Sequence, residues 1–258
     1  MLQIAASVRE QFETDGFYCA QSPVIPRELI ERVIPHMDAV MDCKYETGKP
    51  PEGRCWNPGD SPAKLRKIND THICDRTIHE LVTHPALGKL AAEVTGARMV
   101  QVWATQLLYK PPSPEPSGNV GWHQDRQYWK YWDGEVFTAW VAVSDVTETS
   151  GPMKLIRGSH KWGEREGGDF FSQNMDAQRR TFESQTGGKW EEALAVLPPG
   201  GVSFHHRFTV HGSGPNLSQL PRRSFAIHIR TEKSSPCQSC YYTDNLDDKI
   251  LRPIIYQE

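Results

Sequence analysis

The sequence lacks several features that would each assign it to a class of protein. Lys and Arg number 29 against 32 Asp and Glu, so no basic excess indicates a nucleic-acid binder. No apolar run approaches the roughly 20 residues that a membrane-spanning helix needs. The N-terminus shows no basic stretch followed by an apolar one, so no secretory signal is predicted. We therefore expect a cytoplasmic protein whose partner is neither nucleic acid nor membrane.

Paired cysteines are also scarce. Of the six cysteines, only Cys237 and Cys240 form a CxxC motif. A zinc site would need a second such pair, or a pair of histidines at suitable spacing, and neither accompanies the motif. We expect free thiols on a surface loop, with a redox or metal role as the alternative.

The N-terminal third of the chain has helical patterns. One predicted helix covers 8–14 and closes at Gly16, and a second covers 26–40 with a proline near its first turn. Apolar residues over 78–94 recur at helical spacing, interrupted by Pro85. The chain has no internal repeat and no long low-complexity linker, so we expect residues 1–258 to form a single domain.

The rest of the chain reads as strands. The segments 98–109, 136–143, 201–205 and 224–231 are rich in β-branched, aromatic and alternating positions. Glycine and proline punctuate them without βαβ alternation, which favours a sandwich or barrel over a Rossmann sheet. The polar segment 163–189 is predicted to be a long functional loop. The fold class is therefore mainly β, with a helical N-terminal third packed on it.

Three residues have the pattern of a metal site. In the motif GWHQD, His123 and Asp125 would point to the same face of an extended segment. A lone HxD is a weak signal, but His211 follows between two strand-like segments. Two histidines and one carboxylate form the facial triad of non-haem Fe(II) oxygenases. Zinc or manganese would also accept these ligands.

A basic residue follows the second histidine. Arg222 enters the predicted strand 224–231, and a guanidinium is the best bidentate partner for a carboxylate. We interpret Arg222 as the partner of the far carboxylate of a dicarboxylic co-substrate. Its neighbour Arg223 should face the other way if the strand has begun.

Five motifs together carry a family resemblance. In order along the chain they are LLYKPP, GWHQD, TAWVAVSDVTETSGPMKLIRGSHKWG, LPPGGVSFHH and HGSGPNLSQLPRRSF. With these motifs the chain resembles the phytanoyl-CoA dioxygenase family of Fe(II)/2-oxoglutarate oxygenases. The resemblance implies a double-stranded β-helix, a cupin-like jelly roll with flanking helices. It also implies Fe(II), 2-oxoglutarate and O2 as cofactors.

The resemblance assigns further residues by position. Arg222 would pair with the tail of 2-oxoglutarate, and Ser213 would assist the same carboxylate. Gln106 and Trp140 would line the cofactor pocket, although a core aromatic and an edge polar residue would look the same in sequence. Lys67 would also reach this pocket.

The segment after the first two ligands is interpreted as substrate-binding, with barrel packing as the alternative. The residues assigned to the substrate are Gln124, Gln127, Trp129 and Trp132. Aromatic residues near the predicted site favour a flat or apolar small molecule: Trp103, Trp122, Tyr128, Trp129, Tyr131 and Trp132. The remaining histidines of the motifs are assigned structural roles: His160, His205 and His206.

The expected function is the oxidation of a small-molecule metabolite in natural-product biosynthesis. Because Asp125 is present, we expect hydroxylation, or else desaturation, cyclisation or epimerisation, rather than halogenation. No cluster of Lys and Arg indicates a CoA phosphate site, which disfavours an acyl-CoA hydroxylase. The sequence also leaves open a catalytically silent metal-binding module and a zinc-dependent hydrolase or lyase.

Overall fold

Two antiparallel sheets make up the core of the computed structural model, which describes residues 7–113, 118–187 and 190–258. The large sheet has the order β1-β9-β6-β11-β4-β3-β2, with β12 paired to β4, and the small sheet has the order β5-β10-β7-β8. The strands of the described residues are β1 (Phe17–Cys19), β2 (Gly53–Arg54), β3 (Arg66–Asn69), β4 (Met99–Lys110), β5 (Val120–His123), β6 (Trp132–Ala142), β7 (Met153–Ile156), β8 (Glu192–Ala195), β9 (Val202–His206), β10 (His211–Ser213), β11 (Arg222–Pro236) and β12 (Ile254–Gln257).

This arrangement confirms the predicted fold class, a jelly roll with flanking helices. The four segments predicted as strands correspond to β4, β6, β9 and β11. Three further strands, β1 to β3, lie in the N-terminal third, where each is two to four residues long. Segments this short contain no alternation that the sequence could have revealed.

The helices predicted in the N-terminal third are present, with bounds close to those expected, as α1 (Val8–Asp15), α2 (Arg27–Met41), α3 (Arg76–Val82) and α4 (Pro85–Thr95). The described residues also form a helix that was not predicted, α5 (Met175–Thr186), and the short 3-10 turns η1 (Thr71–Ile73), η2 (Asp125–Gln127) and η3 (Ser159–Trp162). The pattern over 78–94 is two helices, because Pro85 starts α4 as its first residue. Gly16 ends α1 with φ 81°, which a glycine adopts without strain.

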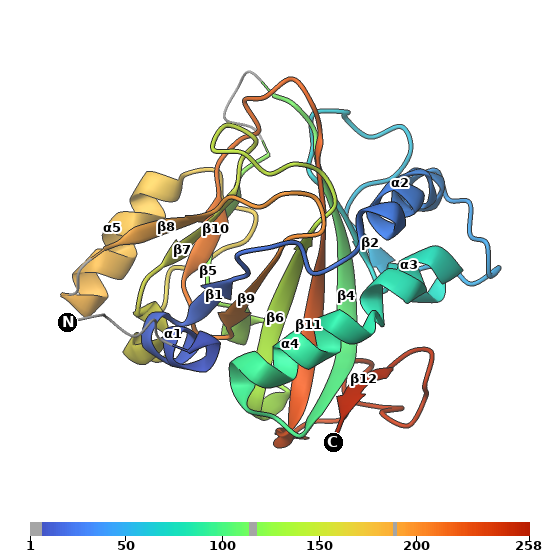
Figure 1. Cartoon of the computed structure of the whole chain (residues 1–258). Helices are drawn as coiled ribbons and strands as arrows, with labels where there is room; N and C mark the ends of the chain where they lie inside the picture. The colour runs from blue at the N-terminus through green and yellow to red at the C-terminus, as the bar shows by residue number, and fades with distance from the viewer. Residues whose placement is uncertain (1–6, 114–117, 188–189) are drawn as a thin grey trace.

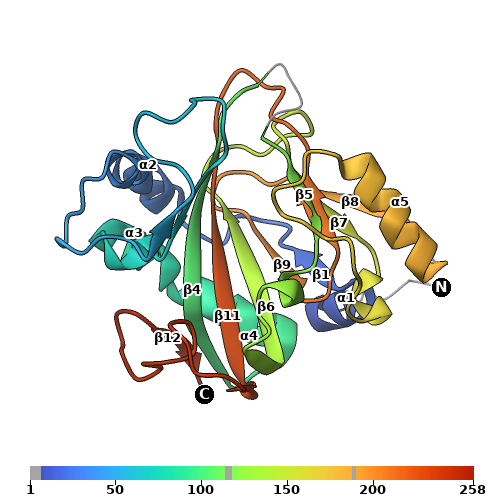
Figure 2. The ribbon, with the colours of Figure 1, turned by 180° about the vertical axis from the view of Figure 1, so that it is seen from behind.

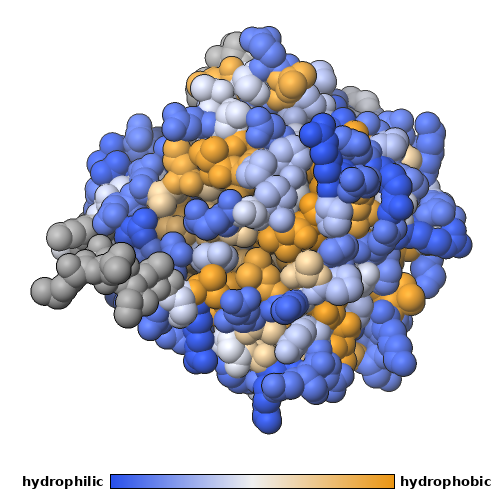
Figure 3. Space-filling model, in the orientation of Figure 1, coloured by the Kyte–Doolittle hydropathy of each residue, from blue (hydrophilic) through white to orange (hydrophobic). Residues whose placement is uncertain are grey.

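Helices α2, α3 and α4 cover one face of the large sheet, as Figures 1 and 2 show from opposite sides. Their apolar residues form one hydrophobic core with Phe225, Ile227 and Ile229 of β11. Because side chains alternate along a strand, Ala226 and His228 point to the other face, toward the small sheet. The site described below therefore lies between the two sheets. The outer surface of the helical side is mostly hydrophilic, with smaller hydrophobic areas between (Figure 3).

One expectation for the polar segment 163–189 was wrong. Rather than a loop throughout, it contains the helix α5, which packs beside β5. Asn174 caps its start and Gly187 its end, and only Gln178 and Phe182 are buried in it. So few buried residues leave no apolar stripe to recognise in the sequence. Residues 188 and 189 lie outside the described part of the chain.

Two smaller expectations can also be compared with the structure. All six cysteines are free, and Cys237 and Cys240 lie in an irregular segment after β11. Among the described residues, no helix has the length and apolar character needed to cross a membrane.

Candidate active site

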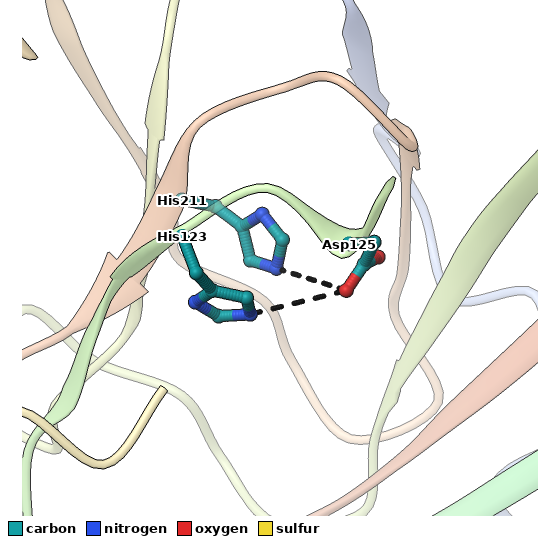
Figure 4. A group of neighbouring side chains, drawn as sticks. All are labelled: His123, Asp125 and His211. Carbon is teal, nitrogen blue, oxygen red and sulfur yellow. Dashed lines mark ion pairs between the residues drawn. The ribbon is translucent and has the colours of Figure 1, made fainter. Parts of the chain in front are cut away.

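Two histidines and one aspartate converge where β5 meets β10 (Figure 4). His123 ends β5 and His211 begins β10, and the two residues are opposite each other in this antiparallel pair. Oδ1 of Asp125 lies 3.8 Å from Nε2 of His123 and 3.8 Å from Nε2 of His211. The three side chains are buried, and their possible ligand atoms all lie within 4.8 Å of one another.

Asp125 reaches this point much as the sequence spacing predicted. β5 ends at His123, but the next residue, Gln124, keeps extended backbone angles of φ -112° and ψ 132°. Alternation along this extended backbone therefore points His123 and Asp125 to the same side. The 3-10 turn η2 begins only at Asp125 itself.

Backbone carbonyls fix the tautomers of both histidines. Nδ1 of His123 lies 2.8 Å from the carbonyl oxygen of Gly121, and Nδ1 of His211 lies 2.9 Å from that of Thr209. A carbonyl oxygen only accepts, so each Nδ1 carries a proton and donates it. Burial lowers the pKa of both histidines, so they are neutral. Each Nε2 therefore offers a lone pair toward Asp125, as a metal-binding histidine must.

The two oxygens of Asp125 have different surroundings. Oδ2 accepts hydrogen bonds from Thr138 at 2.9 Å and from Nε2 of His205 at 3.2 Å. Burial alone would raise the pKa of this carboxyl, but the hydrogen bond from His205 helps to hold it below its usual range. Asp125 is thus ionised, and Oδ1 faces the two histidines. Two neutral nitrogens and one carboxylate oxygen suit Fe(II) and similar divalent cations.

The cavity at these residues has two lobes. The inner lobe runs between the sheets from His123, Asp125 and His211 to Arg222. The residues that line it but not the outer lobe include Leu108, Trp140, Met153, Ser213 and Ala226. The outer lobe opens on the side of His123 and Asp125 that faces away from Arg222. The residues that line it include Lys67, Asn69, Trp103, Tyr128, Trp129, Tyr131, Phe171 and Tyr242. Both lobes share Gln106, His123, Asp125, Phe170 and His228.

Arg222 is the charged group at the far end of the inner lobe. It begins β11, is 2% exposed and lies with its guanidinium carbon 5.2 Å from the ring centre of Trp140. Nη1 donates to the carbonyl of Gly151, and Nε has no partner among the described residues. Burial lowers the pKa of Arg222 to about 10, so the guanidinium is still charged at neutral pH.

Arg223 points away from this lobe, as the alternation of a strand predicts. Its guanidinium forms an ion pair of 2.6 Å with Asp38 of α2 and lies 4.9 Å from the ring centre of Tyr109. The two neighbouring arginines therefore serve different faces of the large sheet.

The other predicted cofactor residues lie at different places in the cavity. Ser213 and Trp140 line the inner lobe with Arg222, and Gln106 lies where the lobes meet. Lys67 lines the outer lobe, with Nζ 4.6 Å from the ring centre of Phe170. It is nearer to the histidines and Asp125 than to the Arg222 end, and burial lowers its pKa.

Of the four residues assigned to the substrate, the structure brings only Trp129 to the cavity. The side chain of Gln124 is fully buried and bonds the backbone at Gly163, Arg165 and Phe208. Gln127 accepts from the backbone of Gln124 and donates to Gly168. Trp132 packs against Trp103 in the aromatic cluster that also contains Trp129. Gln124, Gln127 and Trp132 are not among the residues that line either lobe.

Other residues at the cavity were not singled out from the sequence. Phe170 and Phe171 come from the segment read as a loop, and Tyr242 comes from the C-terminal region. His228 could have been predicted from the sequence. It lies an even number of residues from Arg222 in the same predicted strand, so the two side chains point to one face of β11. Among the histidines assigned structural roles, His160 bonds the backbone of Glu13 and His206 packs on Phe12. His205 holds Asp125.

The structure is thus a jelly roll that holds two histidines and an aspartate between its sheets, with a buried arginine beyond them, and these are the residue types of the facial triad of non-haem iron enzymes. The family model of phytanoyl-CoA dioxygenase (PhyH) matches residues 12–224. The chain belongs to this family.

Curated relatives and solved structures show the same likeness. A protein of Stutzerimonas stutzeri named "Probable alpha-ketoglutarate-dependent hypophosphite dioxygenase" is 26% identical over 189 residues, covering 70% of this chain and 63% of the relative. A 1-deoxypentalenic acid 11-beta-hydroxylase of Streptomyces arenae is 31% identical over 147 residues, covering 55% of this chain and 52% of the relative. Less than two thirds of each relative is therefore matched.

Among solved structures, the epimerase SnoN in complex with Fe3+, alpha ketoglutarate and nogalamycin RO is similar in fold. Its TM-score is 0.70 at 20% sequence identity, and the likeness covers 93% of this chain and 89% of that one. At this level of identity the comparison establishes the shared fold.

Proposed function

We propose that this protein is an Fe(II)- and 2-oxoglutarate-dependent oxygenase that oxidises a small-molecule metabolite. His123, Asp125 and His211 would hold the metal, and residues 1–258 would form one oxygenase domain. The observation that carries the proposal is the pair of lobes that meet at His123 and Asp125, with His211 lining the inner lobe. One lobe ends at a buried arginine and the other is lined by aromatic rings.

The inner lobe suits 2-oxoglutarate. Arg222 would bind the far carboxylate with two parallel hydrogen bonds, and Ser213 would donate to the same group. Trp140 and Gln106 would pack along the chain of the co-substrate. Lys67 lies at the metal end, so we assign it to the carboxylate beside the metal rather than to the one at Arg222.

Fe(II) and 2-oxoglutarate would supply the oxidation, in which one atom of O2 enters succinate with release of CO2 and the other oxidises the substrate. The chain's own residues orient the reactants and exclude water. The rings of Phe170 and Trp129 line the outer lobe, where their centres lie 5.3 Å from the ring centre of His123 and 4.7 Å from that of His228, and they would hold the substrate there.

The outer lobe favours a flat or apolar substrate over a coenzyme A thioester. Most of its distinguishing residues are aromatic, and Lys67 is the one Lys or Arg among the described residues that line it. Coenzyme A phosphates would need several cations at the mouth of the lobe. One relative is named for hydroxylation of 1-deoxypentalenic acid, which agrees with a role in natural-product biosynthesis. We propose hydroxylation as the reaction type.

The test is the visible charge-transfer band of a 2-oxo acid chelated to Fe(II). Anaerobic protein with Fe(II) and 2-oxoglutarate should show the band, and His211→Ala should lose it. His36→Ala is the matched control, because His36 belongs to a second group of possible ligands with Glu46 and Asp75 near the surface. A wild-type protein without the band, or a His211→Ala variant that retains it fully, would show that the assignment is wrong.

A second measurement separates an enzyme from a silent metal-binding module. Wild-type protein with Fe(II), 2-oxoglutarate and O2 is assayed for succinate against a library of aromatic and terpenoid small molecules and acyl-CoA thioesters. We expect stimulation by members of the first group. If only acyl-CoA thioesters stimulate succinate release, the substrate class is acyl-CoA rather than an aromatic or terpenoid molecule. A charge-transfer band without any succinate would support a catalytically silent metal-binding module.

A further inference from the structure

A buried lysine lies behind the inner lobe. Lys110 is the last residue of β4 and is only 1% exposed. Its Nζ donates to the hydroxyl of Ser213 at 2.6 Å, to the carbonyl of Gly214 at 2.5 Å and to the carbonyl of Ser213 at 3.4 Å. Because β4 is in the large sheet and Ser213 in the small one, these bonds join the two sheets at the end of the lobe.

These contacts determine how the Ser213 hydroxyl is used. An ammonium group has three N–H donors and no acceptor, and here it faces three oxygen atoms. The hydroxyl oxygen of Ser213 must therefore accept from Lys110, which leaves its own proton to be donated elsewhere. No acceptor for that proton exists among the residues that the structure describes, and Ser213 lines the inner lobe. The proton is thus available to a ligand in the lobe.

Lys110 also stands directly opposite Arg222 in the pairing of β4 with β11. Side chains of such a pair lie on the same face of the sheet, where like charges repel each other. Burial and the charge of Arg222 both lower the pKa of Lys110. Arg222 stays charged, and none of the carboxylates in the described part of the chain forms an ion pair with it. A buried charge is normally paired, so the Arg222 end of the lobe calls for an anion that the described residues do not provide.

We propose that Lys110 is a positioning residue for the co-substrate. It holds the Ser213 hydroxyl as a donor toward the inner lobe, beside the guanidinium of Arg222. Together they select a 2-oxo acid that carries a carboxylate at its far end. This inference rests on the proposed function, because it takes 2-oxoglutarate as the ligand of the inner lobe.

The test compares two 2-oxo acids on anaerobic Fe(II)-loaded protein, with dissociation constants measured by calorimetry. The first is 2-oxoglutarate, and the second is 2-oxopentanoate, which has the same chain length but no far carboxylate. Lys110→Met should weaken 2-oxoglutarate binding by about 10- to 100-fold, the loss expected for a hydrogen bond to a charged group. It should leave 2-oxopentanoate binding almost unchanged. Lys154→Met is the matched control, because Lys154 pairs with Glu192 outside the lobe.

Two further variants keep the inference testable if Lys110→Met does not fold. Ser213→Ala should show the same preference, losing 2-oxoglutarate affinity but not 2-oxopentanoate affinity. Ser213→Ala should lower the affinity for 2-oxoglutarate less when it is added to Lys110→Met than when it is made in the wild-type protein, because both substitutions act on one hydrogen bond. Lys110→Arg keeps the charge of the side chain and should lose less 2-oxoglutarate affinity than Lys110→Met.

Several results would overturn the inference. The inference is wrong if Lys110→Met, or Ser213→Ala, binds 2-oxoglutarate with unchanged affinity. Equal weakening of both acids by Lys110→Met would mean that Lys110 only joins the sheets. If wild-type protein binds no 2-oxoglutarate, the proposed function fails and this inference with it. If wild type binds and Lys110→Met binds equally well, only this inference fails.

Discussion

Thr138 donates a hydrogen bond of 2.9 Å to Oδ2 of Asp125 and so keeps that oxygen turned away from the two histidines. The hydroxyl proton of Thr138 is used in this bond, so the 3.0 Å contact with Nδ1 of His228 must have the imidazole as donor. Thr138 and His228 are opposite each other in β6 and β11. A chain of hydrogen bonds thus links the large sheet to the carboxylate.

Thr138→Val tests this link. Valine has nearly the same shape as threonine but cannot donate, so Asp125 should lose part of its orientation. Removing such a partner typically costs about 10- to 100-fold in metal affinity. We expect a loss in this range when Fe(II) or Co(II) binding is titrated anaerobically. Thr138→Ser keeps the hydroxyl and should bind nearly as wild type. Equal affinities of Thr138→Val and wild type would mean that Asp125 needs no support from Thr138.

Arg222→Ala should weaken 2-oxoglutarate binding far more than Arg223→Ala. Loss of one partner from a buried ion pair costs roughly 3–5 kcal/mol, which is a factor of hundreds or more in affinity. Arg223 pairs with a half-exposed Asp38, so its loss should lower the free energy of unfolding by about 1 kcal/mol or less. Calorimetry and urea unfolding on both variants separate the two effects. Similar 2-oxoglutarate affinities in both variants would contradict the assignment of Arg222.

Much of the architecture could be read from the sequence because alternation and helix-ending residues are local signals. Pro85 and Gly16 marked helix boundaries, and β11 was visible from its alternating apolar residues. The distant histidine His211 was proposed from its position between two strand-like segments and from the motif around it, since nothing local links it to His123. Sequence alone could not show that the Gln124 amide is used by backbone groups, because those groups come from segments far along the chain.

The position of Gln124 leads to a stability prediction. Its amide bonds two partly buried carbonyls and one backbone N–H, so Gln124→Ala would leave these groups without this partner. Each unsatisfied buried group costs about 1–3 kcal/mol, and we expect the free energy of unfolding to fall by about 2–4 kcal/mol. Gln127→Ala, which loses bonds nearer the surface, should cost less. Urea unfolding measures both. If Gln124→Ala is as stable as the wild-type protein, Gln124 has no such structural role, and its prediction as a substrate residue would be favoured again.

Asp125→Ala should abolish substrate oxidation while still allowing metal and 2-oxoglutarate to bind. Asp125 would provide one of three ligands and the negative charge of the proposed site, and the two histidines are held by backbone carbonyls. Its loss should therefore weaken the site rather than erase it. Asp133→Ala is the control, because Asp133 is an exposed aspartate in β6.

The two variants are compared with wild type at saturating Fe(II), with metal affinity, the charge-transfer band and succinate release all measured. For Asp125→Ala we expect lower metal affinity, a band at high metal concentration, and no oxidation of any substrate found by the succinate assay. A vacated ligand position could take water or halide, but halogenation would also need a substrate hydrogen in the right place, so we expect none. Oxidation at the wild-type rate by Asp125→Ala would show that this carboxylate is not an essential ligand. The interpretation of the HQD motif as the first half of the metal site would then be wrong.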